Sequence, residues 1–531
     1  MYHHLTHLEN RLSGEINLES IIALDEQIRE HEVALARLKR ARNSLLNISK
    51  LLPEVLGQIF SWNVTLRDDF GGLGEESHNF LLVCHHWFEV ASSTPEVWSF
   101  WGSAPKDWAR WYHRSRTAPL DLVLNVIDDD GSFGPTLSDV LQDRANLDTV
   151  RRIHLRAADT ELLGAIISSL TASSSELQPS GVESLILQND SNGSVDISGF
   201  FSRHRFPRLR RLELFDCTIS SWDLIVSRTT ALTTLGLNLH TTKPTPTTIQ
   251  VLSILTSNPT LQKISLSGYW VAGGGGGGGN PSPRVSLHHL KDLELDGDPQ
   301  CVFGFLSRLD HPRHLDRLFV ALDPCVVEDI SRFIGPYLQD HVQRRGRSQS
   351  GLGLTLRLPY DDFITLHIGD VGRMDFSAPV PAQMKPFVTI SIELNQRVFA
   401  DLWQKVALNL IAHTPREEIV YFQACGELMT TEDISIQFPN LRGLHFERTP
   451  LHTAFPRSNL DRAGKIFPSL QYVFLDRVIV DDGDWDPLTT FLDYRVSSGN
   501  RLHTLVHVGA YHMNPAVQRI LEGLVQKFAY V

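Results

Sequence analysis

The sequence predicts an α+β multidomain chain, in which an N-terminal helix and a small helical bundle precede an irregular α/β solenoid. Apolar residues recur at helical spacing up to about residue 102, and a short apolar template then repeats many times. Helical patterns separate the copies of that template. Because a chain of 531 residues is too long for one hydrophobic core, we expect two or more folding units.

Composition and charge argue against several classes of partner. The formal net charge is −12 and the pI about 6.0, whereas a dedicated nucleic-acid binder needs a basic face. We therefore expect neither nucleic acid nor a membrane surface as partner. The polar N-terminus does not resemble a signal peptide, and no stretch has the roughly 18 apolar residues of a membrane helix. Five scattered cysteines favour a reducing compartment, so we expect a cytoplasmic or nuclear protein.

Residues 1–46 contain an amphipathic helix with a heptad pattern. His31 occupies one d position of the pattern and Arg42 one a position, so the apolar stripe is interrupted twice. Two interpretations stay open: a dimerising coiled coil, or a single helix whose stripe packs against the next module, which we favour. The apolar stripe consists of Ile21, Leu24, Ile28, Leu35 and Leu38.

Residues 47–102 predict a bundle of three helices. Pro53 suits the first turn of the first helix, where its missing N–H costs nothing. A polar insertion between Ser61 and Asn79 separates this helix from a second one in NFLLVCHHWFEVA. Thr94 and Pro95 are then suited to cap and start a third helix.

The stretches LPEVLGQIF, LLVCHHWFEVA and TPEVWSFW together resemble the F-box, in the fungal F-box-like variety that a helix precedes. The resemblance implies a helical bundle that docks on the Skp-type adaptor of a cullin–RING ubiquitin ligase. The long insertion departs from the family pattern and puts the docking affinity in doubt. Carried over position by position, the adaptor-binding residues are Leu52, Pro53, Leu56, Ile59, Phe60, Val83, Cys84, Trp87 and Trp98.

Some of these residues must instead form the core of the bundle itself. An apolar face at helical spacing is more often a domain's own core than an interface. Yet Trp87, Trp98 and Trp101 lie within fifteen residues, which is more aromatic mass than so small a bundle usually buries. Because tryptophan is enriched at binding hot spots, we favour an interface role for part of this set.

A degenerate repeat occupies residues 150–531. Each copy has apolar residues at its first, fourth and sixth positions, and the copies start 23 to 32 residues apart within each of two series, from 150 to 315 and from 441 to 502. The nine clean copies begin at Val150, Val182, Leu209, Leu232, Leu261, Leu290, Leu315, Leu441 and Leu470, and a weaker one begins at Leu502. One short strand and one helix per copy resemble the unit of a leucine-rich-repeat solenoid, in which stacking supplies the core.

Two stretches fit the repeat less clearly. Residues 103–149 are expected to be a connecting segment. Residues 324–440 are irregular: LGLTLRL, ITLHIG, FVTISIEL and EEIVYFQAC predict strands, and RVFADLWQKVALNLIA and VVEDISRFIGPYLQDHVQRR predict helices. Whether this part continues one array or separates two is left open.

Three stretches that could suggest a phosphate-binding or metal-binding site lack the residue spacing that such sites require. The run Gly273–Gly279 lacks the Lys and Ser or Thr of a phosphate loop, and Asn-Pro-Ser-Pro follows it. His85 and His86 lie beside Cys84, but adjacent helical residues point about 100° apart and chelate one ion poorly. Asp128–Asp130 lacks the alternating ligands of a calcium loop. We expect no enzymatic activity, no cofactor and no metal.

The residues and the resemblances together predict a substrate-recognition adaptor of a ubiquitin ligase of the SCF type. The F-box-like bundle would bind the Skp-type adaptor, and the repeat array would bind a target protein whose identity the sequence does not reveal. The alternative is a leucine-rich-repeat scaffold unrelated to ubiquitin, in which the bundle only caps the solenoid.

Overall fold

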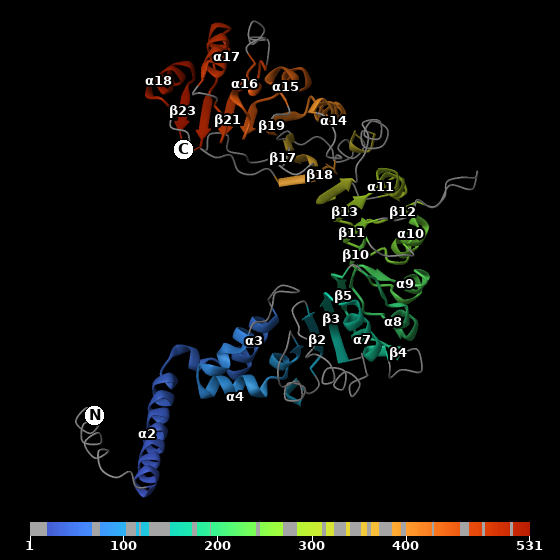
Figure 1. Ribbon diagram of the computed structural model, residues 1–531, viewed down its shortest axis with the longest axis vertical. Helices are drawn as coiled ribbons and strands as arrows, with labels where there is room; N and C mark the ends of the chain where they lie inside the picture. Colours follow the sequence, from blue (N-terminus) through green and yellow to red (C-terminus); the bar gives the residue numbers. More distant parts are fainter. Residues whose placement is uncertain are drawn as a thin grey trace, which may run out of the picture. The chain divides into compact units, whose positions relative to one another are not determined.

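A computed structural model of the chain divides into two units, Met1–Arg156 and Ala157–Val531, and each is described by itself (Figure 1). The structure describes residues 18–65, 75–101, 113–115, 118–126, 149–171, 178–191, 193–240, 245–268, 284–310, 315–322, 336–339, 352–357, 363–370, 385–393, 400–426, 429–456, 467–480, 484–509 and 513–530.

The first unit begins with helices and ends with strands. In chain order these elements are α2 (Leu18–Ser44), η1 (Asn47–Lys50), α3 (Pro53–Thr65), η2 (Glu75–Leu82), α4 (His85–Ser93), η3 (Pro95–Trp98), β1 (Phe100–Trp101), β2 (Leu120–Val126) and β3 (Val150–Ala157), η marking 3₁₀ helices. The predicted N-terminal helix and first bundle helix are therefore present.

The apolar stripe of α2 is not packed against the bundle, contrary to the interpretation we favoured. Ile21, Ile28, Leu35 and Leu38 are all exposed, and only Leu24 is half-buried. The physical reason lies at the end of the helix. A turn after Ser44 leads into η1, so the helix separates from the bundle instead of folding back along it.

Strand β2 lies within the stretch predicted as a connection. It pairs in parallel with β1, with Phe100 opposite Asp121, and also pairs with β3. Asp121 is fully buried, and Arg151 on β3 donates to its two carboxylate oxygens at 2.9 and 2.6 Å. A buried carboxylate needs such a partner, so this pair ties β2 to β3.

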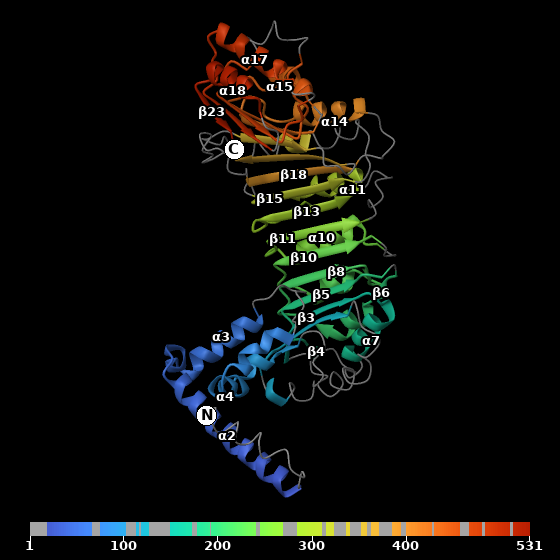
Figure 2. The same cartoon turned by 60° about the vertical axis from the view of Figure 1, so that its left-hand side comes forward.

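The second unit is a ladder of strands with helices along one side, as Figure 2 shows. Its strands are β5 (Ser184–Asn189), β8 (Arg211–Phe215), β10 (Thr234–Leu239), β11 (Lys263–Gly268), β13 (Asp292–Gly297), β15 (Arg317–Leu322), β16 (Leu352–Arg357), β17 (Phe363–Asp370), β18 (Lys385–Glu393), β19 (Ile419–Cys425), β20 (Gly443–Glu447), β21 (Tyr472–Asp476), β22 (Thr504–Val508) and β23 (Lys527–Tyr530).

Helices connect most neighbouring strands. They are α7 (Thr160–Thr171), α8 (Ser198–Arg203), α9 (Asp223–Arg228), α10 (Thr248–Ser257), α11 (Pro299–Leu306), α14 (Ala400–Ala412), α15 (Thr431–Gln437), α16 (Leu451–Ala454), α17 (Asp486–Ser497) and α18 (Pro515–Leu524). Three pairs of two-residue strands, β4 with β7, β6 with β9 and β12 with β14, bridge successive turns. They are Gln178–Pro179, His204–Arg205, Val195–Asp196, Cys217–Thr218, Val285–Ser286 and Leu309–Asp310.

The apolar template aligns in register from strand to strand. Its second positions form one column, and all six are fully buried: Leu185, Leu212, Leu235, Ile264, Leu293 and Leu318. Because neighbouring strands are parallel, equal positions of successive copies lie side by side and bury one another. The predicted repeat array is confirmed as a leucine-rich-repeat-like sheet of alternating strands and helices.

The irregular stretch continues the same ladder, but with three strands in reverse order. The spatial order is β15, β18, β17, β16, β19, and β17 runs antiparallel to both of its neighbours. Only residues 358–362 separate β16 from β17, too few for the helical crossover that parallel pairing requires. The predicted strands and the helix at RVFADLWQKVALNLIA are confirmed. The helix predicted at 326–345 lies largely outside the described residues.

Residues that follow the strands recur in the left-handed backbone region. Asp216, Arg448 and Arg477 directly follow β8, β20 and β21, and each has a φ of 51°. After β19 and β22 the equivalent residue is a glycine with positive φ, Gly426 or Gly509. The amide of Asp216 donates to the carbonyl of Asn238 on the next strand at 2.8 Å. This backbone state costs a non-glycine residue free energy, and the continued ladder bonds offset that cost.

A buried asparagine joins two successive repeats. Asn258, at the end of α10, accepts a hydrogen bond from the backbone N–H of Leu232 at 3.1 Å and donates to the carbonyl of Ile254 at 2.9 Å. It is fully buried, so neither backbone group has water as an alternative partner. The same entry turn, without the asparagine, recurs at FPRL, FPNL and FPSL.

We predict that Asn258→Ala lowers the free energy of unfolding of the array by about 1–3 kcal/mol, because it leaves the Leu232 N–H unsatisfied. Urea unfolding followed by circular dichroism measures the change. The matched control is Asn440→Ala, whose exposed amide bonds the Glu417 carbonyl and whose loss should shift stability by no more than about 0.5 kcal/mol. Equal effects of the two substitutions would contradict the bridging role of Asn258.

Candidate binding surfaces

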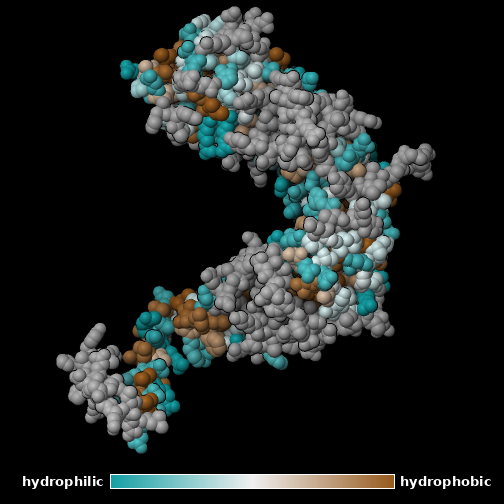
Figure 3. All heavy atoms as spheres, in the orientation of Figure 1, coloured by the Kyte–Doolittle hydropathy of each residue, from teal (hydrophilic) through white to brown (hydrophobic). Residues whose placement is uncertain are grey.

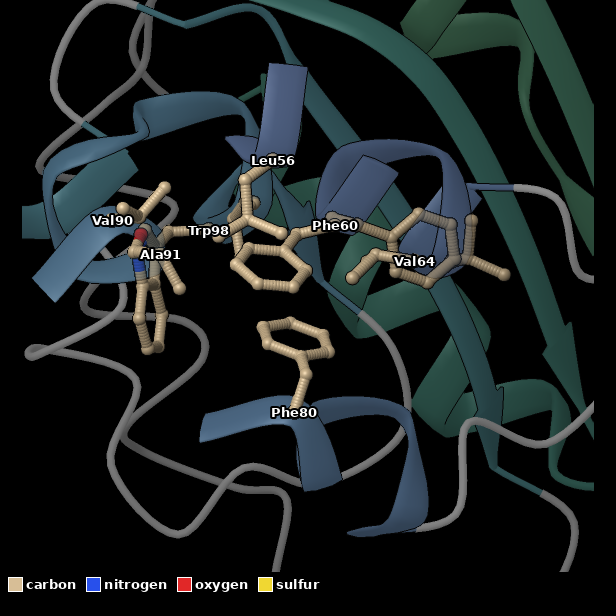
Figure 4. Close-up of a cluster of buried hydrophobic side chains, with 10 residues drawn as sticks. Leu56, Phe60, Val64, Phe80, Val90, Ala91 and Trp98 are labelled. Carbon is tan, nitrogen blue, oxygen red and sulfur yellow. The ribbon is translucent and has the colours of Figure 1, made fainter. Parts of the chain in front are cut away.

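The helical bundle is held together by stacked aromatic rings (Figure 4). Phe60 of α3 and Phe80 of η2 stack with centroids 4.5 Å apart and planes 7° from parallel, and the Trp87 ring lies 5.2 Å from Phe60. The indole N–H of Trp98 donates to the carbonyl of Ala91 at 2.7 Å. A buried indole N–H needs such a partner, so Trp98 fixes η3 against α4.

The nine residues predicted to bind an adaptor divide into three groups. Three of them lie in the core, where they hold the helices together instead of meeting a partner: Leu56, Phe60 and Trp98. Two are half-buried: Cys84 and Trp87. Four are exposed: Leu52, Pro53, Ile59 and Val83. Leu56, Phe60 and Trp98 are buried because the bundle is small and has few other large side chains to form its core.

Helix α3 carries two apolar stripes. Leu56, Phe60 and Val64 recur every four residues and face the core. A second stripe, which we name the α3 stripe, recurs at intervals of three, four and three residues and is exposed on an adjacent face of the helix. It consists of Leu52, Val55, Ile59 and Trp62.

The α3 stripe is a candidate docking surface because large apolar side chains rarely gather in water without a partner. Trp62 is 60% exposed and Leu52 65% exposed. Figure 3 shows hydrophobic surface gathered over the part of the bundle that contains α3. Sequence reasoning missed Val55 and Trp62 as surface residues, although the intervals of three and four along PEVLGQIFSW carry that signal.

The second and third bundle helices differ from their predicted form. The expected continuous helix from Phe80 to Ala91 is broken at Val83 and Cys84, between η2 and α4, which leaves Leu82 84% exposed. The third is a single 3₁₀ turn. Its expected cap, Thr94, donates its hydroxyl to the carbonyl of Val90 at 2.8 Å instead of accepting from the new turn.

The exposed face of the ladder contains a hollow of about 290 Å³. Gly236 and Ser265 lie opposite each other on β10 and β11 and are smaller than their neighbours in the same row. Glu213 precedes Gly236 across the ladder, and Glu294 follows Ser265. Small residues between two longer ones leave space above the strands. We call this space the ladder hollow. The residues that line it include Glu213, Gly236, Ser265, Glu294 and Phe319.

The lining of the ladder hollow has three carboxylates, Glu213, Glu294 and Asp296, against one ammonium, Lys263, and this balance favours cationic or hydrogen-bond-donating groups. Glu213 accepts from Arg211 at 2.9 Å, and neighbouring Asp296 accepts from the Ser267 hydroxyl at 2.6 Å. Glu294 makes no hydrogen bond or ion pair with the described part of the chain. Glu294 lies opposite Phe319, whose ring already has the guanidinium of Arg317 5.7 Å from its centroid. The carboxylate of Glu294 suits a guanidinium or ammonium of a partner.

Two groups of the kinds that bind metal ions, the His85 imidazole and the Cys217 thiol, have other surroundings. His85 Nδ1 lies 3.2 Å from the carboxylate of Glu89, one helical turn away. Burial, with the charge of Asp216 beside it, raises the pKa of the Cys217 thiol to about 12, so it stays protonated. Among the described residues no three His, Cys, Asp or Glu side chains are grouped to hold an ion. Gly273–Gly279 and Asp128–Asp130 lie outside the described residues.

Comparisons with known proteins show one distant structural likeness and no match in sequence. Neither a protein-family model nor a curated protein matches the sequence. One similar solved chain belongs to the crystal structure of a TLR13–ssRNA13 complex, at 12% identity and a TM-score of 0.30. The likeness covers 78% of this chain and 49% of that one, so this chain spans about half of the TLR13 chain. Of the helices described, none is both long and apolar enough to cross a membrane.

We predict opposite consequences for the two stripes of α3. Leu56→Ala should lower the stability of the bundle by about 2–5 kcal/mol, because Leu56 is fully buried and leaves a cavity. Ile59→Ala should change stability by about 0.5 kcal/mol or less, since Ile59 is 42% exposed. Thermal unfolding of both variants beside the unmodified chain measures the difference, and an equally destabilised Ile59→Ala would show that the α3 stripe is structural.

Proposed function

We propose that this chain is a substrate-recognition adaptor of a cullin–RING ubiquitin ligase, with the bundle binding a Skp-type adaptor and the array binding a target protein. The observation that carries the proposal is the α3 stripe, an exposed apolar surface on the helix with the F-box-like sequence. In this proposal the chain positions its target, and other subunits carry out the chemistry.

The composition of the α3 stripe suits a binding hot spot. Trp62 supplies a large aromatic side chain, and Leu52, Val55 and Ile59 surround it with aliphatic area. Side chains of this kind dominate interface energetics when a partner removes them from water. Beneath the stripe, the Phe60–Phe80 stack holds α3 in place, so little order has to be gained on binding.

We predict that Ile59→Asp weakens binding of a purified Skp-type adaptor at least about tenfold, because the partner would bury an unpaired carboxylate. Calorimetric titration of the adaptor into the full chain measures the change. The matched control is Ile249→Asp, on α10 of the array, where the isoleucine is 54% exposed against 42% for Ile59. A well-folded unmodified chain that binds no Skp-type adaptor would overturn the proposal.

We place target recognition on the exposed ladder face, and within it on the ladder hollow. Leucine-rich-repeat-like arrays present the side chains between their buried positions, and here those side chains include Glu213 and Glu294, the second of them directly opposite Phe319 on the next strand. The target would then offer a basic side chain at this point.

We predict that Glu294→Lys removes a subset of the proteins labelled by proximity labelling in cells whose proteasome is blocked, because it reverses the charge that receives the target. Glu161→Lys is the matched control: it makes the same charge change at an exposed position of α7. Identical labelling by the two variants would show that the ladder hollow does not contact the target.

A second candidate function is a repeat scaffold in which the bundle has no adaptor. It is favoured by Val123 of β2, which belongs to the same buried cluster as Leu56, Phe60 and Trp98. The bundle is thereby joined to a strand as well as to its own helices. The titration of a Skp-type adaptor separates the two functions, since a scaffold predicts no binding and no effect of Ile59→Asp.

A further inference from the structure

Helix α2 extends for 27 residues with its apolar stripe uncovered. Ile28 is 54% exposed, Leu35 51% and Leu38 70%. A helix of this kind gains little stability from its own side chains, because helices in proteins are stabilised mainly by packing of an apolar face. The stripe would therefore be stabilised by a partner that covers it.

The spacing of the stripe is that of a coiled coil. Ile21, Ile28 and Leu35 lie seven residues apart, and Leu24 and Leu38 each lie three residues after one of them. A regular seven-residue repeat lets two helices pack their stripes along their whole length. His31 occupies the remaining d position within the stripe.

Charges along α2 are divided between its two halves. From Leu18 to Glu32 the helix has five acidic residues and a single basic one, Arg29, and the charged residues of the rest of the helix are all basic. The acidic residues are Glu19, Asp25, Glu26, Glu30 and Glu32, and the basic residues of the second half are Arg37, Lys39, Arg40 and Arg42. Two such helices attract each other when they run in opposite directions and repel each other when they run in the same direction.

We propose that α2 binds a second copy of itself as an antiparallel coiled coil, making the protein a dimer. With the two stripes aligned, Ile21 packs against the second copy's Leu38, Leu24 against its Leu35 and Ile28 against its His31. The segment 19–26, with three acidic residues, then lies along the segment 33–40, with three basic ones. Each of these three pairs occurs twice in the dimer, which gives a seam of six core layers.

Charged residues beside the stripe give the arrangement a specific pair. Asp25 and Lys39 each directly follow a d residue, Leu24 and Leu38, so they lie on the same edge of the stripe. Helical side chains lean toward the N-terminus of their own helix. In an antiparallel pair the Asp25 and Lys39 side chains of different copies therefore lean toward each other, twice per dimer. In a parallel pair in register they lie about four turns apart along the helix axis.

Sedimentation equilibrium of the full chain tests the proposal. We expect a dimer, and we expect Ile28→Asp to give a monomer, since a carboxylate would enter the apolar seam. Because Ile28 is exposed within the single chain, this substitution should leave the near-ultraviolet circular dichroism unchanged, since α2 contains no Trp, Tyr or Phe and the signal comes from the rest of the chain. A monomeric unmodified chain, or a dimer that Ile28→Asp leaves intact, would overturn the proposal.

Charge exchange tests the direction of the two helices. Lys39→Glu should weaken the dimer about tenfold by placing two acidic pairs on its edges, and adding Asp25→Lys in the same chain should restore it. The matched control is Arg40→Glu, which makes the same charge change on the face opposite the stripe. Lys39→Glu without effect, or no rescue by the double exchange, would exclude the antiparallel arrangement. His31→Leu should strengthen the dimer by completing the seam.

Discussion

Hydrogen bonding between neighbouring strands in register, most of them parallel, is the constraint on which the larger unit depends. Each strand exposes its template residues to water unless a neighbour lies beside it in register, as Leu212 does with Leu235 and Leu235 with Ile264. No single turn can bury its own apolar residues, so the core exists only because the turns stack. The recurring left-handed residues and the buried amide of Asn258 serve this stacking, because each satisfies backbone groups that joined turns would otherwise leave unpaired.

The same constraint explains how the ladder tolerates the reversed strands β16, β17 and β18. The outer two of these strands, β18 and β16, present their edges to β15 and β19 in the parallel sense. The antiparallel β17 lies between them and pairs with both. Hydrogen bonding and burial therefore continue across the irregular part, although the order of strands along the chain does not.

In the helical unit the decisive fact is how apolar residues are divided between core and surface. The bundle buries Phe60, Phe80 and Trp98 and leaves Leu52, Ile59 and Trp62 in water. The uncovered stripes of α3 and of α2 differ in kind. The first is short, aromatic and held by a rigid core, which suits a separate partner, whereas the second is long, heptad-spaced and divided in charge, which suits its own copy.

The sequence by itself determined the repeat, its strands and part of its helices, because the period of apolar residues directly reflects which residues are buried together. It also identified α3 and the heptad of α2, whose spacing is local. It did not separate the core residues Leu56, Phe60 and Trp98 from the exposed Leu52, Ile59 and Val83, since both groups are apolar and lie at helical spacing. Only the tertiary structure decided that division, the order of β16 to β18 and the position of the ladder hollow. Each of these depends on which segments lie side by side, and that is set by packing between residues distant in the sequence.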